Sequence, residues 1–244
     1  MRKKLTLLTL VFALIISSLS AYTDSFASTN SNPLFNKLIT ALKNEEKESV
    51  VLPLYKEYTE SGITAVEKSR IEYHMARYYK DTKNKAKARE HVELEGMYMD
   101  MLDDSATPLE RLVVEVDYTS ARYYVNKEMS IGMENSELTK KLYSQYPDEF
   151  YAALTESWRL IYTPAIVGGS YRKALRLLKD IENNKAGISY LDESGLYTAI
   201  GYASYMREEY TNAEKYLNKA KTFYTKDPLV LETMKEVQEK LRGN

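Results

Sequence analysis

The chain has 244 residues, and its 34 Lys and Arg nearly balance its 35 Asp and Glu, which gives a formal net charge of −1 at pH 7. This balance gives no argument for nucleic acid or an anionic membrane as a partner. The sequence contains no cysteine. That absence excludes disulfide bonds, a thiol nucleophile and the acylated cysteine of a bacterial lipoprotein.

The first residues are typical of a secretory signal peptide, with a basic start at residues 2–4, an apolar run at 5–16 and small residues around Ala27. The apolar run is shorter than the about 20 residues that a membrane-spanning helix needs. We therefore expect cleavage of residues 1–27 and a short tail at 28–33. The product is expected to be exported, periplasmic or secreted, soluble, and neither lipid-anchored nor stably inserted in a membrane.

Apolar residues at helical spacing run nearly from Leu34 to Leu241, and the whole chain has only nine Gly and six Pro. No stretch shows the alternation and turn signals of strands. Short breaks, several with a helix-starting Asp, Ser or Thr, fall at residues 60–62, 103–108, 126–130, 146–149, 163–170, 183–189 and 226–228. We therefore predict an all-α domain over residues 34–244, with about ten or eleven helices and no long linker.

One phrase occurs twice in this helical pattern: YHMARYYK begins at Tyr73, and YTSARYYV begins at Tyr118. In each copy the mainly apolar positions share one helical face, since residues three and four apart lie on the same side. A Tyr–Arg pair at four-residue spacing, Tyr73 with Arg77 and Tyr118 with Arg122, lies on the opposite face. The phrase predicts one type of helix used twice, with each Tyr–Arg pair exposed.

The C-terminal half carries a clearer repeat pattern, in the stretch YTAIGYASYMREEYTNAEKYLNKA. Its aromatic, Ile-Gly, Ala, Leu and Ala positions are Tyr197, Ile200, Gly201, Ala213, Leu217 and Ala220. A second copy uses Trp158, Ile161, Tyr171, Ala174, Leu178 and Ile181. With these spacings the sequence resembles tetratricopeptide repeat proteins, of an exported bacterial type, over most of residues 34–241.

The resemblance implies helical hairpins that stack into a solenoid, because one such hairpin cannot bury its apolar face alone. It also places Gly201 and Ala213 where the two helices of one hairpin touch. Glu72 and Asp117 depart from the pattern, since they stand where the family has a buried aromatic residue. The spacing of the copies also exceeds the family's usual period of about 34 residues.

No motif for catalysis or for a cofactor stands out, because GxSxG, HExxH and P-loop patterns are missing from the sequence. His91 and Glu95 give two possible metal ligands without a third, so a solvated pair on a charged helix is the preferred interpretation. The loop Pro164–Ser170 is interpreted as a connector rather than as an anion-binding loop. We therefore predict no catalytic residues, no metal and no cofactor.

The resemblance implies a binding scaffold, since first helices of such arrays line a concave surface that holds a peptide, a protein or an envelope component. By position, the residues nominated for ligand binding are Tyr73, Arg77, Tyr118, Arg122, Arg159, Tyr202 and Tyr205. Tyr and Arg suit peptides through stacking and hydrogen bonds. Two alternatives stay open: a periplasmic ligand-binding accessory subunit of a TRAP-type transporter, and an enzyme with an unrecognised carboxylate site. The partner's identity and the oligomeric state also stay open.

Overall fold

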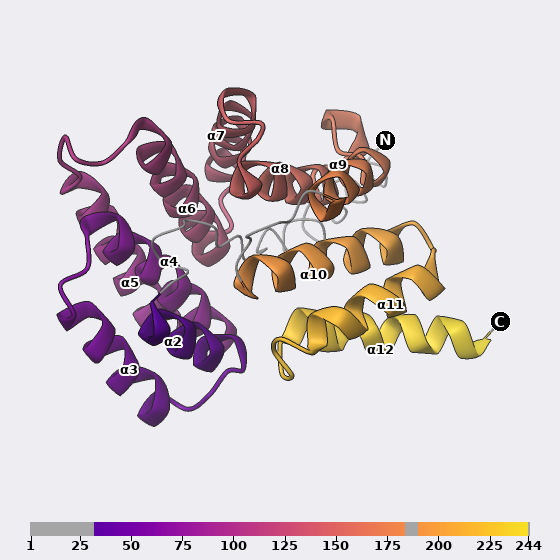
Figure 1. The fold of residues 1–244 in the computed structure, drawn as a ribbon, viewed down its shortest axis with the longest axis horizontal. Helices are drawn as coiled ribbons and strands as arrows, with labels where there is room; N and C mark the ends of the chain where they lie inside the picture. The colour runs from indigo at the N-terminus through magenta and orange to yellow at the C-terminus, as the bar shows by residue number, and fades with distance from the viewer. Residues whose placement is uncertain (1–31, 184–189, 244) are drawn as a thin grey trace, which may run out of the picture.

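The structure, a computed structural model, describes residues 32–183 and 190–243. The predicted signal peptide at residues 1–27 and residues 28–31 of the predicted tail lie outside the described residues. Within the described part, the chain is helical and free of strands, and its helices follow one another along a curved path (Figure 1). The all-α prediction is confirmed there.

Eleven α-helices lie within the described residues, in agreement with the expected number. They are α2 (Pro33–Lys43), α3 (Glu48–Glu60), α4 (Ala65–Asp81), α5 (Lys85–Asp100), α6 (Pro108–Asn126), α7 (Met129–Gln145), α8 (Phe150–Tyr162), α9 (Tyr171–Asn183), α10 (Tyr190–Met206), α11 (Tyr210–Lys221) and α12 (Pro228–Gly243). A single turn of 3-10 helix, η2 (Ala165–Val167), lies between α8 and α9. The described connections include every predicted break in this part of the chain, and further ones at residues 44–47, 82–84 and 207–209.

Local sequence signals start the two helices that carry the repeated phrase. Thr64 caps α4 and Thr107 caps α6, and each hydroxyl accepts a hydrogen bond from the backbone N–H of a Glu three residues later. The carboxylates of these residues, Glu67 and Glu110, accept in turn from the threonine N–H. This reciprocal capping box satisfies two backbone donors that a helix N-terminus otherwise leaves without partners. Both helices therefore begin in the same way.

The helices associate as consecutive hairpins, α2–α3, α4–α5, α6–α7, α8–α9 and α10–α11, with α12 against α11. The first helices α4, α6, α8 and α10 lie toward the inner side of the curve, and the second helices α5, α7, α9 and α11 lie toward its outer side (Figure 1). Each hairpin buries against its neighbours the apolar face that it would expose alone. The architecture is an all-α array of helical hairpins.

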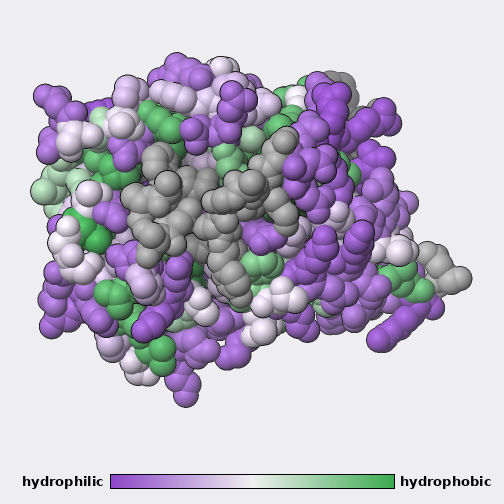
Figure 2. Space-filling model, in the orientation of Figure 1, coloured by the Kyte–Doolittle hydropathy of each residue, from purple (hydrophilic) through white to green (hydrophobic). Residues whose placement is uncertain are grey.

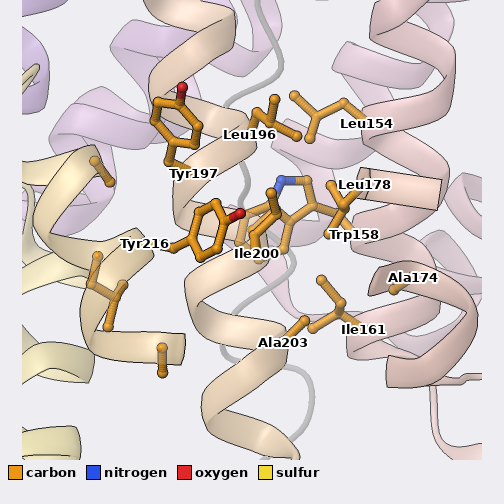
Figure 3. Packing of buried hydrophobic residues seen from close by; sticks show 14 of the residues in the cluster. Leu154, Trp158, Ile161, Ala174, Leu178, Leu196, Tyr197, Ile200, Ala203 and Tyr216 are labelled. Carbon is orange, nitrogen blue, oxygen red and sulfur yellow. The ribbon is translucent and has the colours of Figure 1, made fainter. Parts of the chain in front are cut away.

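Trp158 of α8 lies at the centre of the C-terminal core, where three hairpin helices meet (Figure 3). Its indole packs in one buried cluster with Leu178 of α9 and Ile200 of α10, and all three side chains are less than a tenth exposed. Burial of the large Trp side chain removes a large apolar area from water. The cluster therefore fixes α8, α9 and α10 against one another.

Helices α10 and α11 approach closely at Gly201. A Cβ atom at this position would lie 2.8 Å from Leu217 Cγ and 3.2 Å from the Leu217 backbone nitrogen. Ala213, on the same side of α11, is fully buried in the same cluster. The two helices thus touch where the sequence places Gly201 and Ala213.

The two ends of the array also touch each other. Lys43, the last residue of α2, forms an ion pair with Asp227, which precedes α12; the Nζ–Oδ2 distance is 3.4 Å, and the side chains are 6% and 8% exposed. The same Nζ lies 5.6 Å from the ring centroid of Tyr224, and Tyr224 is buried in the core around α2 and α4. Outside this contact, Lys226 and Glu46 form an exposed pair at 2.9 Å. The contact closes the curve of hairpins.

Hydrophilic side chains cover most of the face shown in Figure 2, with small apolar groups between them.

The longest of the described helices, α6, has 19 residues and carries Glu110, Arg111, Glu115, Asp117 and Arg122 along its length. Across residues 32–183 and 190–243, no helix has both the length and the hydropathy that crossing a membrane requires.

Gly201→Ala is expected to lower the free energy of unfolding by about 1–3 kcal/mol, because the added methyl group overlaps Leu217 and the backbone of α11 must shift. Gly96→Ala is the matched control, since its Cβ would meet only the half-buried Tyr118 ring, at 3.0 Å or more. Alanine also favours a helix over glycine by about 0.5–1 kcal/mol. Chemical denaturation measures the free energy of unfolding of both variants. Equal decreases in the two would contradict the close approach of α10 and α11.

Asp227→Asn is expected to destabilise the protein by about 3 kcal/mol, because it removes the carboxylate charge that pairs with the buried Lys43 ammonium while the cap of α12 keeps an acceptor. Glu46→Gln, which breaks the exposed pair with Lys226, is the control and is expected to cost less than about 1 kcal/mol. Lys43→Met in the Asp227→Asn background should recover most of the loss. Thermal and urea unfolding test the series, and equal midpoints for the Asn and Gln variants would refute the role of the buried pair.

Candidate functional site

The residues nominated for ligand binding all lie on α4, α6, α8 and α10, the helices toward the inner side of the curve (Figure 1). Tyr73, Arg77 and Arg159 are buried, with exposed fractions of 3%, 3% and 6%. The half-buried ones are Tyr118, Arg122, Tyr202 and Tyr205. The prediction that the Tyr73–Arg77 pair is exposed is therefore wrong.

Arg77 is buried because aromatic rings from two helices enclose its guanidinium. The Cζ atom lies 5.6 Å from the ring centroid of Tyr73 on α4 and 4.7 Å from that of Tyr124 on α6. Its Nη1 donates a hydrogen bond to the Tyr73 hydroxyl at 3.1 Å. Cation–π contacts of this kind strengthen when they are removed from water. The face of α4 that was expected to be exposed thus packs toward α6.

The same contact region gathers further charge around Tyr124. The Tyr124 hydroxyl donates to the Asp81 carboxylate, and the ammonium of Lys127 lies 4.4 Å from the Tyr124 ring centroid. Burial, with Lys80 and Arg77 nearby, lowers the pKa of Lys127 to about 8. Burial likewise raises the pKa of Asp81. Both shifts reflect the removal of charged groups from water.

The second Tyr–Arg pair has different neighbours from the first. Arg122 lies 5.4 Å from the Tyr118 ring and 3.5 Å from Glu134 on α7, so it faces its own hairpin partner. The Tyr118 ring lies against Gly96 on α5. Arg77, in contrast, contacts the next first helix. The two copies of the phrase therefore place their Tyr–Arg pairs in different surroundings, although the sequence predicts one type of helix used twice.

The guanidinium of Arg159 forms an ion pair with a carboxylate on its own helix. Its Nε and Nη2 atoms donate to the two carboxylate oxygens of Glu156, each at 2.6 Å, in a bidentate pair. Both side chains are almost fully buried. A bidentate Arg–carboxylate pair is among the stronger charged hydrogen bonds. Arg159 is therefore buried and paired within its own helix rather than presented on the inner surface.

Tyr202 and Tyr205, in contrast, belong to a continuous row of rings, which we name the aromatic ladder: Trp158, Tyr162, Tyr202, Tyr205 and Tyr210. The Trp158 and Tyr162 rings are stacked at 5.2 Å on α8. Tyr202 follows at 5.6 Å from Tyr162, Tyr205 at 6.3 Å from Tyr202, and Tyr210 of α11 at 6.3 Å from Tyr205. The ladder thus crosses from α8 over α10 to α11.

The ladder changes from a buried end to an accessible end. Trp158 and Tyr162 are 3% exposed, whereas Tyr202, Tyr205 and Tyr210 are half-buried. The Tyr205 hydroxyl donates to Glu236 of α12, and this hydrogen bond together with burial raises the pKa of Tyr205 to about 12. The hydroxyl therefore stays protonated at neutral pH. The buried rings support the accessible ones, which offer apolar faces with polar tips.

Sequence reasoning named Tyr202 and Tyr205 but missed Tyr162 and Tyr210 as members of the ladder. Trp158 and Tyr162 are four residues apart, and Tyr202 and Tyr205 are three apart, so each pair lies on one helical face. That spacing is the available signal. The alignment of rings between α8, α10 and α11 depends on how the helices pack, which periodicity does not give.

A second group that sequence reasoning missed is a set of buried carboxyls on three neighbouring helices, Glu72 (α4), Glu95 (α5) and Asp117 (α6). Glu72 accepts a hydrogen bond from the Tyr55 hydroxyl at 2.6 Å, and its other oxygen lies 2.5 Å from His91 Nδ1. His91 thus pairs with Glu72 and is buried, which corrects the interpretation of a solvated pair with Glu95.

The partners of Asp117 come from both sides along the array. Arg70 of α4 lies 3.2 Å from one carboxylate oxygen, and the Tyr151 hydroxyl of α8 donates to the other. The Arg70 guanidinium also lies 5.4 Å from the Tyr151 ring centroid. Polar partners from α4 and α8 thus stabilise the Asp117 carboxylate in the core.

Glu95 differs from the other two carboxyls. It is fully buried, and its carboxyl oxygens have no hydrogen-bond partner in the part of the chain that the structure describes. Burial, and then the nearby Asp117 and Glu72, raise its pKa well above 4.5. Burial thus favours the neutral form of this carboxyl. Over residues 32–183 and 190–243, no group of three His, Cys, Asp or Glu is arranged to hold a metal ion.

Fold and site together define an all-α array of helical hairpins that presents a partly accessible row of aromatic rings. Comparison of the chain with protein-family models, with curated proteins and with solved structures gave no match in any of the three.

Glu95→Gln is expected to stabilise the protein at neutral and alkaline pH. The unfolded chain releases this proton near pH 4.5, whereas the folded protein holds it to higher pH, so the native Glu95 lowers the free energy of unfolding as the pH rises above 4.5. Urea denaturation between about pH 5 and pH 9 should show a flatter profile for Glu95→Gln than for the native protein. Glu93→Gln, an exposed residue on the same helix, is the control. Parallel profiles for Glu95→Gln and the native chain would show that Glu95 ionises normally.

Proposed function

We propose that this protein is an exported, tetratricopeptide-like scaffold that binds an extended peptide segment of a partner protein on its aromatic ladder. The observation that carries the proposal is the accessible end of the ladder, at Tyr202, Tyr205 and Tyr210. Export is proposed on the signal-like start of the sequence, and the absence of cysteine argues against a lipid anchor.

The spacing of the accessible rings suits an extended chain. Their centroids follow one another at 6.3 Å, and side chains on one face of an extended peptide recur about every 6.6 Å. Successive rings can therefore each contact one of the alternate side chains of a bound segment. Tyr is well suited to this role because its ring is rigid and amphipathic, so that little conformational entropy is lost on binding.

Polar groups beside the rings supply the other half of peptide recognition. The Tyr205 hydroxyl is fixed toward Glu236, so ring and carboxylate lie together at the edge of α12. Such a pair can exchange hydrogen bonds with the backbone of an extended peptide. The segment we expect to bind therefore has apolar or aromatic residues at alternate positions, with its backbone hydrogen-bonding groups free of secondary structure.

The proposal is for binding rather than catalysis. If the protein were an enzyme with a carboxylate site, the candidate carboxyls would be those of Glu72, Glu95 and Asp117. Their exposed fractions are 0%, 0% and 2%. Tyr and His partners already occupy Glu72. A general acid or base must come within hydrogen-bond reach of its substrate. These carboxyls are therefore assigned to the core, where they specify how α4, α5 and α6 pack.

The double variant Tyr202→Ala/Tyr205→Ala is expected to weaken peptide binding about 10-fold or more, since aromatic anchors of an interface typically contribute more than about 1 kcal/mol each. Peptides are first selected from a random displayed library on the native protein. Their dissociation constants for the native and variant proteins are then measured by calorimetry. The unfolding midpoint of the variant is measured in parallel, to separate loss of the rings from loss of the fold.

Tyr98→Ala is the matched control, because Tyr98 is also half-buried but lies on α5, outside the ladder. It should bind the selected peptides with native affinity. Selection of no peptide, or equal affinity of the native protein and a folded Tyr202→Ala/Tyr205→Ala variant, would rule out the ladder as the binding surface.

A further inference from the structure

The connection between α8 and α9 holds two apolar side chains in solvent. Ile166 is 82% exposed and Val167 is 55% exposed, on the single 3-10 turn η2. Ile166 is the most exposed large hydrophobic side chain among the described residues. Apolar side chains of this size are usually buried, and the two adjacent ones here form an exposed apolar tip, of the kind that gains stability from contact with another apolar surface.

The backbone of this connection is fixed rather than loose. Gly168 has a φ of 101°, a conformation that favours glycine. A Cβ atom on Gly169 would lie 1.6 Å from the Thr163 carbonyl oxygen, so only glycine fits there. The N–H groups of Val167 and Gly169 both donate to the Pro164 carbonyl, at 2.9 and 3.1 Å. The two glycines thus hold Ile166 and Val167 outward on a defined turn.

Basic residues follow the tip directly. The sequence contains no Asp or Glu from residue 157 to residue 179. Arg172, Lys173 and Arg176 of α9 are exposed, and none of them forms an ion pair within residues 32–183 and 190–243. A chain with a net charge of −1 therefore carries a local positive patch next to an exposed apolar tip.

We propose that the α8–α9 connection docks this protein reversibly on an anionic lipid surface. Ile166 and Val167 enter the boundary between headgroups and acyl chains, while Arg172, Lys173 and Arg176 contact lipid phosphates. Stable peripheral binding requires two such signals, a small apolar insertion and a polybasic patch. The proposal concerns a different surface from the aromatic ladder, and it stands independently of peptide binding.

The chemistry of the tip favours lipid over a protein partner. Residues 164–169, PAIVGG, carry no side chain that can donate or accept a hydrogen bond. A protein interface usually places such groups around its apolar centre. In the acyl region, in contrast, backbone polar groups must be satisfied internally. The N–H groups of Val167, Gly168 and Gly169, on the C-terminal side of Ile166, are hydrogen-bonded within the turn itself.

Vesicle flotation tests the proposal. The protein used is purified in the processed form that is found in cells. The probes are vesicles of phosphatidylcholine alone and of phosphatidylcholine mixed with phosphatidylglycerol, at low and at high salt. The native protein is expected to bind the mixed vesicles and to lose binding at high salt. Replacing the three basic residues with Gln should weaken binding about 100-fold, at about fivefold for each cation.

Ile166→Ser/Val167→Ser should weaken binding about 10-fold or more, because it removes the apolar insertion. Met129→Ser/Met133→Ser is the matched control, since this pair on α7 is 56% and 66% exposed and lies outside the connection; it should bind as the native protein does. In Ile166→Trp the tryptophan emission should shift to the blue on adding mixed vesicles.

Equal binding of the native protein and the Ile166→Ser/Val167→Ser variant to the mixed vesicles would overturn the proposal. So would a native protein that binds phosphatidylcholine vesicles but not the mixed ones. If the native protein binds no vesicles and instead captures an acidic protein through the same tip, the α8–α9 connection is a contact surface for a protein partner. None of these outcomes depends on the affinity of the ladder for peptides, so the two proposals fail separately.

Discussion

The buried ion pair between Lys43 and Asp227 is the contact that makes one closed body out of a row of hairpins. It joins residues 184 positions apart, and its side chains are less than a tenth exposed. A charge in such a place must keep its partner, because the cost of leaving it alone exceeds that of most surface contacts. With the ends held together, the first helices lie toward the inner side of the curve (Figure 1).

The two halves of the array have different interiors. In the N-terminal half, charged groups are buried as partners, as in Arg70 with Asp117 and His91 with Glu72. In the C-terminal half, the inner helices carry the stacked rings of Trp158 and its neighbours, beside the buried Arg159–Glu156 pair. Buried charge pairs specify one arrangement of helices but leave little to offer a ligand, whereas half-exposed rings leave apolar faces free for contact.

The two proposed surfaces have complementary physical roles. The aromatic ladder lies where α8, α10 and α11 meet, and it suits a segment of peptide by stacking. The apolar tip at Ile166 belongs to the connection that leaves α8, so the same helix supports both surfaces. A scaffold that holds a peptide with one surface and a lipid headgroup layer with another would concentrate its partner at the membrane.

The sequence by itself determined the helical class and the places of the breaks, since both depend on local periodicity and capping. The close contact at Gly201 was expected from the repeat pattern that the sequence resembles. The same pattern marked Glu72 and Asp117 as departures from the repeat. Only the tertiary structure decided that Arg77 and Arg159 are buried, that the two Tyr–Arg pairs have different neighbours, and that five rings line up across three helices. The physical reason is that periodicity defines the faces of one helix, whereas the neighbour that covers each face depends on how the array curves and closes.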